Sequence, residues 1–238
     1  SGLAPDYRRP GQMAPYKASA KPAHGVFRQA LYTGLLPFND PRMHNKVGFL
    51  FTWALLIPLA QAATVAVQVQ DSTGKPLPGA VVFLESREAR QVSKPLVGAE
   101  IAQTGRQFVP RVLVVPTGTS VTFPNRDTVR HHVYSFSPTK QFELKLYTGT
   151  AANPVVFDKP GIAVLGCNIH DNMSAWVVVV ETPFYASVDA QGAASLRDVP
   201  AGNYRLRVWH PGLAVGAPAA EQALVVGAAD VALSYRLG

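Results

Sequence analysis

Short stretches of alternating apolar and polar residues dominate the chain after residue 63. Residues 64–70 alternate strictly, so their three valines share one face, and this pattern predicts a half-buried β-strand. A turn rich in Asp, Gly and Pro at 71–76 separates this strand from a second apolar stretch at 80–84. Residues 85–98 lack such a pattern, and we interpret them as a polar, basic linker.

The same kind of pattern continues towards the C-terminus. Further strands are expected at 107–115, 119–123, 131–136, 142–147, 154–157, 161–167 and 175–180, and another set lies within 186–235. No apolar repeat of helical period is long enough after residue 63 to predict a helix. Strands about 8 to 12 residues apart with turn signals between them predict an all-β fold, a sandwich or barrel.

Composition supports a globular protein and argues against nucleic-acid binding. Of the 238 residues, 47% are hydrophobic and 16% are charged, and the formal net charge is +7. Residues 1–62 hold seven Lys and Arg against two Asp and Glu, which leaves 15 and 13 of the totals of 22 and 15 for the rest. Because most of the excess charge precedes the predicted strands, no nucleic-acid partner is expected.

Residues 43–62 have the layout of a signal peptide. A short basic segment at 43–46 precedes an uncharged apolar stretch at 47–59 and a small-x-small cleavage site at 60–62. The apolar stretch is shorter than the roughly 20 residues that span a membrane. We therefore expect export to a bacterial periplasm, with no stable membrane insertion after cleavage. Residues 1–42 are interpreted as a disordered upstream translation or cloning sequence.

The chain has one cysteine, Cys167, and it begins an unusual loop. An exported protein with one cysteine cannot form an internal disulfide, so its thiol is a liability unless it is buried or bound to metal. Residues 167–173 read Cys-Asn-Ile-His-Asp-Asn-Met, which places a thiol, an imidazole and a thioether three residues apart. These are three of the ligand types of a blue-copper centre, and the adjacent His131 and His132 are candidates for the missing imidazole.

This loop resembles that of the cupredoxins, the plastocyanin and amicyanin family. Its C-x-x-H-x-x-M spacing is similar to the short spacing of amicyanin, and residues 125–131 resemble the segment around the first histidine of amicyanin. The likeness covers about 98–182 and extends to bacterial cupredoxins associated with methylamine utilisation. It implies a Greek-key sandwich that binds one copper ion, as Cu+ or Cu2+, through His131, Cys167, His170 and, on the axis, Met173.

One position departs from the family pattern. The residue after the first ligand is usually Asn, whereas here it is His132. Either His132 orients the loop through a hydrogen bond, or the register is shifted and His132 is itself the ligand. Alternation along a strand puts the two rings on opposite faces, so both cannot face one metal. We favour His131.

The segments on either side resemble a second kind of sandwich. Residues 69–81 resemble the opening of transthyretin-like, carboxypeptidase-regulatory-like sandwiches, and 189–206 resemble their closing strands. We therefore expect a small β-sandwich made of 64–90 and 184–238, with a cupredoxin domain at 98–182 inserted between them. The alternative is a single cupredoxin with extra strands at each end.

These features predict a periplasmic type 1 copper protein that carries single electrons. Its expected partner is a transient redox protein, such as a c-type cytochrome or a periplasmic oxidoreductase, reached through the His170 ring and a docking surface that includes Ile169 and Asn172. The alternatives are a periplasmic copper chaperone or sequestration protein, and a module in which the metal is only structural. No catalytic triad, phosphate loop or pair of carboxylates occurs, so we do not expect an enzyme.

Overall fold

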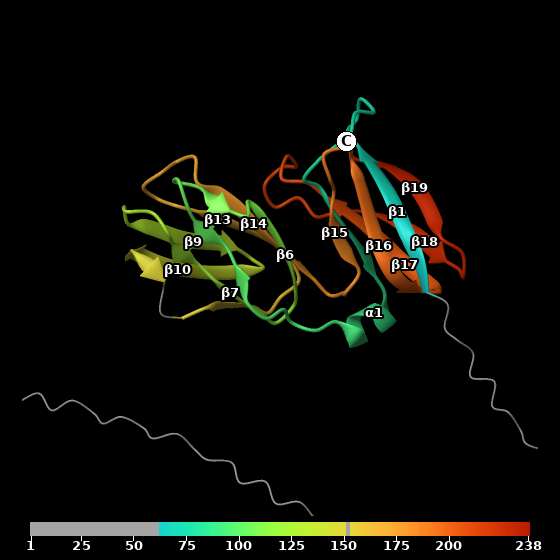
Figure 1. Cartoon of the computed structure of the whole chain (residues 1–238), viewed down its shortest axis with the longest axis horizontal. Coiled ribbons are helices and arrows are strands. Elements are labelled where there is room, and N and C mark those ends of the chain that lie inside the picture. Colours follow the sequence, from blue (N-terminus) through green and yellow to red (C-terminus); the bar gives the residue numbers. More distant parts are fainter. Residues whose placement is uncertain (1–61, 151–152) are drawn as a thin grey trace, which may run out of the picture. The chain divides into compact units, whose positions relative to one another are not determined.

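The computed structural model describes residues 62–150 and 153–238, and β-strands make up most of this part of the chain (Figure 1). Nineteen strands and one short helix occur within it. The all-β class predicted from the sequence is therefore confirmed. Residues 1–42 and nearly all of the predicted signal peptide at 43–62 lie outside the described residues.

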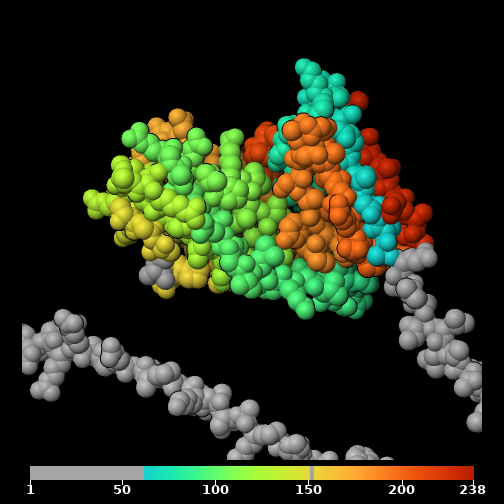
Figure 2. Space-filling model, viewed as in Figure 1, coloured from blue at the N-terminus to red at the C-terminus, as the bar shows by residue number. Residues whose placement is uncertain are grey.

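Strands from both ends of the described chain form two sheets, which we call the flanking sandwich. The sheet orders are β16-β1-β19 and β15-β2-β17-β18. The strands are β1 (Ala62–Gln70), β2 (Val81–Glu85), β15 (Tyr185–Ser187), β16 (Ala193–Pro200), β17 (Gly202–Trp209), β18 (Ala220–Val226) and β19 (Val231–Arg236). The first strand pairs in parallel with β19 and antiparallel with β16, and Figure 2 shows cyan β1 against orange and red C-terminal residues.

Alternation along β1 decides what fills the core of the flanking sandwich. Its three valines, Val65, Val67 and Val69, are at most 2% exposed, as their spacing predicts. Leu206 and Val208 of β17 belong to the same apolar cluster and are fully buried. The cluster thus contains side chains from both sheets, which is the arrangement of a β-sandwich.

The residues between Ala99 and Val180 form three more sheets, which we call the central sandwich. The sheet orders are β10-β9-β13-β14-β6, β11-β8-β4-β5 and β12-β7-β3. The strands are β3 (Ala99–Glu100), β4 (Ala102–Gln103), β5 (Phe108–Val109), β6 (Val112–Pro116), β7 (Thr119–Thr122), β8 (Pro124–Asn125), β9 (His131–Ser137), β10 (Lys140–Tyr147), β11 (Gly149–Thr150), β12 (Val155–Phe157), β13 (Gly161–Gly166) and β14 (Ser174–Val180). Phe108, Phe123 and Phe157 lie in its apolar core, and Cys167 and Met173 belong to the same cluster.

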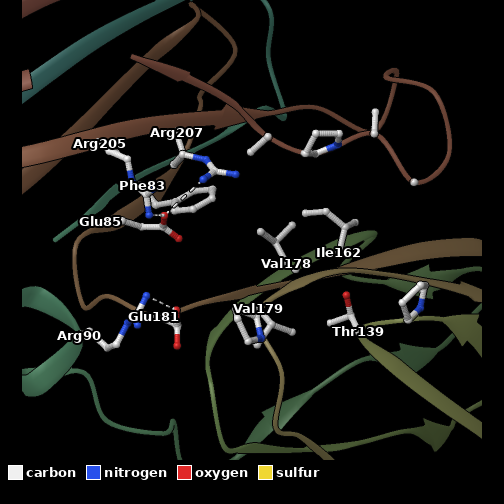
Figure 3. Close-up of a pocket in the computed structure, with 17 residues that line it drawn as sticks. Phe83, Glu85, Arg90, Thr139, Ile162, Val178, Val179, Glu181, Arg205 and Arg207 are labelled. Atoms are coloured by element: carbon white, nitrogen blue, oxygen red, sulfur yellow. Dashed lines mark hydrogen bonds and ion pairs between the residues drawn. The ribbon is translucent and has the colours of Figure 1, made fainter. Parts of the chain in front are cut away.

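A third apolar cluster joins the two sandwiches. It contains Trp209 of β17, and the ring of Trp176 in β14 packs against it with 6.2 Å between the ring centroids. Ion pairs lie beside this cluster. Arg90 contacts Glu181 at 2.7 Å, and the guanidinium of Arg207 lies near the Glu85 carboxylate (Figure 3).

One short helix lies in the segment that we interpret from sequence as a linker. This helix, α1 (Arg87–Val92), begins after Ser86, whose hydroxyl accepts a hydrogen bond from the Ala89 N–H at 3.0 Å. Ala89 is its only buried residue, so the helix has no apolar stripe from which a sequence pattern could predict it. The interpretation of 85–98 as a plain linker is therefore wrong for residues 87–92. No helix in the described part of the chain is both long and apolar enough to cross a membrane.

The packing of the flanking sandwich can be tested by truncating one core leucine. We expect Leu206→Ala to lower the free energy of unfolding by about 2–5 kcal/mol, because the buried side chain leaves a cavity. Leu146→Ala is the matched control, since Leu146 is 46% exposed, and it should cost less than about 1 kcal/mol. Urea unfolding followed by circular dichroism measures both. Equal losses for the two variants would contradict the assigned core.

Candidate metal centre

Strand β9 positions the first residue of the centre. It begins at His131, whose side chain is fully buried, and the next inward-facing residue, Val133, lies in the core of the central sandwich. His132 faces the other way, because successive side chains of a strand alternate between the two faces of the sheet. Its ring packs on Tyr134, the next residue on that face, with 5.4 Å between the centroids.

A tight connection between two antiparallel strands supplies the other residues. Cys167 directly follows β13, and β14 begins at Ser174, so seven residues make the whole turn. The Met173 N–H donates a hydrogen bond to the His170 carbonyl at 3.0 Å, which closes the loop on itself. Cys167 and Met173 are 5% and 2% exposed, whereas His170 is half-buried. The loop thus buries both sulfur side chains and leaves the imidazole partly open to solvent.

These two segments bring three predicted ligands together. One donor atom from each of His131, Cys167 and His170 lies within 4.8 Å of the other two. The Cys167 Sγ is 3.9 Å from the His170 Nδ1, and the two imidazole centroids are 5.0 Å apart. The fourth predicted residue, Met173, is buried in the same core as Cys167. Whether these residues bind metal stays a prediction, but their convergence is a property of the fold.

A carboxylate fixes the orientation of the His131 ring. The His131 Nε2 is 2.8 Å from an Asp127 carboxylate oxygen, and because an ionised carboxylate can only accept, the imidazole donates. The proton therefore lies on Nε2 and the lone pair on Nδ1. That Nδ1 is buried and has no hydrogen-bond partner among the described residues. A buried nitrogen with a free lone pair is costly unless something binds it, and metal-ligating histidines commonly have this arrangement. The Nδ1 of His132 is likewise buried without a partner among the described residues, so it is the convergence with Cys167 and His170 that singles out His131.

Asp127 is itself held by a neighbouring loop. Its two carboxylate oxygens accept hydrogen bonds from the backbone N–H groups of Gly105 and Arg106, at 2.6 and 2.9 Å. The Arg106 N–H lowers the pKa of Asp127 most, and the contact with His131 lowers it further against the opposing effect of burial. Asp127 thus remains ionised and able to accept at neutral pH. Sequence reasoning missed this residue, although an aspartate four residues before a candidate ligand is visible in the sequence.

The adjacent histidine contacts a different carboxylate. The His132 Nε2 lies 2.9 Å from a carboxylate oxygen of Glu143 in β10, and the ring is directed away from Cys167 and His170. The loop before β9 is instead tied down by Asn125, whose side-chain amide donates to the carbonyls of Val129 and Tyr147 at 2.8 and 2.7 Å. His131 and His132 thus have separate surroundings, and the centre contains only the first of them.

The donor set is selective for soft or borderline metal ions. A thiolate and a thioether favour copper, zinc or iron–sulfur chemistry over magnesium or calcium, and imidazole suits copper and zinc. Two imidazoles and one thiolate with a buried thioether match the trigonal copper geometry best, because a structural zinc site takes four strong ligands. The residues present therefore fit copper.

Comparisons with known proteins give likenesses to solved structures only. No protein-family model matches the chain, and no curated protein matches it. A purple cupredoxin from Nitrosopumilus maritimus is 26% identical, with 34% of this chain and 99% of that chain covered and a TM-score of 0.31. A copper-containing nitrite reductase from Thermus scotoductus is 23% identical, with 48% and 28% covered and a TM-score of 0.33. A point mutant of amicyanin in its reduced Cu(I) form is 21% identical, with 42% and 98% covered and a TM-score of 0.32.

These likenesses concern partial stretches at low identity. This chain spans little more than a quarter of the nitrite reductase. Copper binding by this chain is therefore inferred from the geometry of its own residues.

The orientation of His131 can be tested in metal-free protein. We expect its ring to be protonated on Nε2 at about pH 8, where a free imidazole is neutral. Asp127→Ala removes the acceptor and should shift His131 towards a mixture of tautomers, which two-bond proton–nitrogen NMR measures. His132 provides the control in the same spectra, because its partner is Glu143 and its tautomer should not change. A wild-type His131 protonated on Nδ1 would contradict the proposed role of Asp127.

Proposed function

We propose that this chain is a type 1 copper protein that carries single electrons between redox partners. The observation that carries the proposal is the convergence of His131, Cys167 and His170 on one buried point, with the Nδ1 of His131 left without a partner among the described residues. Met173 would be the long axial ligand. Copper bound there supplies a one-electron Cu+/Cu2+ couple.

The chain's own part in this function is to hold the ligands still. Cu+ and Cu2+ prefer different geometries, so fast electron exchange requires ligands that barely move between the two states. His131 is fixed by β9 and by Asp127, and Cys167 is fixed at the end of β13. The thiol is 5% exposed and packs among apolar core residues, which restricts the access of water and small oxidants to it. Rigidity and exclusion of water therefore both come from the β-framework.

The half-buried His170 is the proposed route for electrons. It is the most exposed of the three convergent residues, and its neighbour Ile169 is 46% exposed. One exposed apolar side chain beside a partly exposed ligand suits a brief encounter, since redox complexes bury little surface. We propose that the protein works in the periplasm, without catalysing a reaction of its own, and exchanges electrons with a c-type cytochrome or a periplasmic oxidoreductase.

The copper centre is tested first by colour. We expect the purified protein with one equivalent of Cu(II) to show an intense visible charge-transfer band and a reversible one-electron wave in voltammetry. Cys167→Ser should abolish the band, because it arises from the thiolate, and should cost the metal-free protein about 1–3 kcal/mol of stability, because it places a hydroxyl in an apolar core. A colourless wild type would overturn the proposal. A blue protein with no reversible wave would favour the alternative of copper sequestration.

The two adjacent histidines provide a matched pair of variants. We expect His131→Ala to lose the visible band, because it removes one of the three convergent donors. His132→Ala removes another buried imidazole one residue away and should keep the band, since its ring contacts Glu143 instead. Absorption and paramagnetic-resonance spectra measure both, and unfolding curves of the metal-free variants show whether each still folds. The opposite result would place His132 in the centre.

A further inference from the structure

A polar depression lies beside His170, and two arginines line it. Its volume is about 500 Å³, and Arg106, Arg111, His170 and Asp171 are among the lining residues. Neither arginine belongs to the Cys167 loop or has a side-chain part in the centre described above. Their positions therefore need a separate explanation.

Neither arginine takes part in an ion pair with another described residue. Four other arginines of the described chain form ion pairs with glutamates: Arg90, Arg126, Arg205 and Arg207. Within the described residues, Arg106 and Arg111 form no such pair, which is also true of Arg87, Arg130, Arg197 and Arg236; the first two differ in that both line the depression. Both are exposed. The depression contains one carboxylate, Asp171, against two guanidinium groups. It is therefore a site of net positive charge beside the proposed route for electrons.

The backbone of Arg106 is in a conformation that favours glycine. Its φ is +58°, in the left-handed region, where most side chains are disfavoured by roughly 1 kcal/mol. The preceding Gly105 also has a positive φ, and both N–H groups donate to Asp127. The backbone geometry is thus explained by the support of His131, but it does not require an arginine. Strained positions of this kind cluster at functional sites.

Arg111 is positioned by an aromatic ring. Its guanidinium carbon lies 5.0 Å from the centroid of the Trp176 ring, which is a cation–π contact. Such a contact fixes the side chain without neutralising its charge. The planar N–H donors stay available, and a guanidinium in this state suits a carboxylate partner.

We propose that Arg106 and Arg111 form a docking site for an acidic surface of the redox partner, next to the exposed edge of His170. This inference rests on the proposed electron transfer and adds the charge of the partner. Opposite charge at a small contact raises the rate of encounter more than the lifetime of the complex, and salt screens it. Carboxylates of the partner would therefore bring its redox centre to the copper ligand that is partly open to solvent.

The first experiment uses two small redox probes of opposite charge on the copper-loaded protein. Anionic hexacyanoferrate(III) and cationic tris(phenanthroline)cobalt(III) each take one electron, so that copper passes from Cu(I) to Cu(II) as iron or cobalt passes from the trivalent to the divalent state. We expect the double variant Arg106→Glu and Arg111→Glu to slow oxidation by hexacyanoferrate roughly tenfold at low salt and to speed oxidation by the cobalt complex. The difference should shrink with added salt.

A matched control separates a local effect from a change in net charge. Arg197 and Arg236 are exposed residues of the flanking sandwich, and changing both to Glu alters the charge by the same amount. We expect this control to change the rates less than about twofold. Equal effects of the two double variants would overturn the docking site while leaving the copper centre intact. Absence of the blue band from the copper-loaded wild-type protein would instead contradict the proposed function itself.

The second experiment does not depend on electron transfer. We expect a hexa-aspartate peptide, added to metal-free protein at low salt, to shift the amide NMR signals of Arg106, Arg111 and Asn172, and the Arg106→Glu, Arg111→Glu variant to lose these shifts. Substitution by Gln in place of Glu should lose most of the binding too, since it removes charge with little change in shape. Shifts caused by inorganic phosphate but not by the peptide would overturn the proposal in favour of a small-anion site.

Discussion

The pleat of β9 is the constraint on which the centre depends. Side chains of a strand alternate between two faces, so of two adjacent histidines only one can face the core. The inward ring is His131, and the strand keeps it at 5.0 Å from the His170 ring, while the outward His132 contacts Tyr134 and Glu143. Rotation of the strand by one residue would exchange the two rings and move Val133 out of the core. Burial of the apolar side chains of β9 therefore also determines which of the two imidazoles faces the core.

The surroundings of the centre form a connected chain of contacts. Backbone N–H groups of Gly105 and Arg106 hold Asp127, Asp127 holds the His131 ring, and one nitrogen of that ring lies within 4.8 Å of a donor atom of Cys167 and of His170. The loop that supports the buried side of the centre also carries one of the two arginines beside His170. Support of the His131 ring and the proposed docking site thus share one short segment.

Part of this arrangement could be predicted from the sequence. Strict alternation at 64–70 predicted the buried valines of β1, because a strand buries every second residue. Helix α1 could not be predicted, since it buries a single side chain and depends on the cap at Ser86. The loop spacing predicted that Cys167 and His170 are neighbours, but the position of His131 depends on strand pairing distant in sequence. Asp127 was missed although it precedes His131 by only four residues, and the two arginines were missed because the depression forms only when separate loops meet.

The pairing of β1 has a consequence for the order in which the chain can fold. Its two neighbours in the sheet, β16 and β19, lie more than a hundred residues later in the sequence. As the polypeptide emerges during synthesis, all strands of the central sandwich appear before either neighbour does. The loop at 167–173 can therefore form early, whereas β1 has no pairing partner on either hydrogen-bonding edge until β16 and β19 are present. Such an edge is prone to mispairing with other chains, so we expect holdase chaperones to bind β1 before its partners are made.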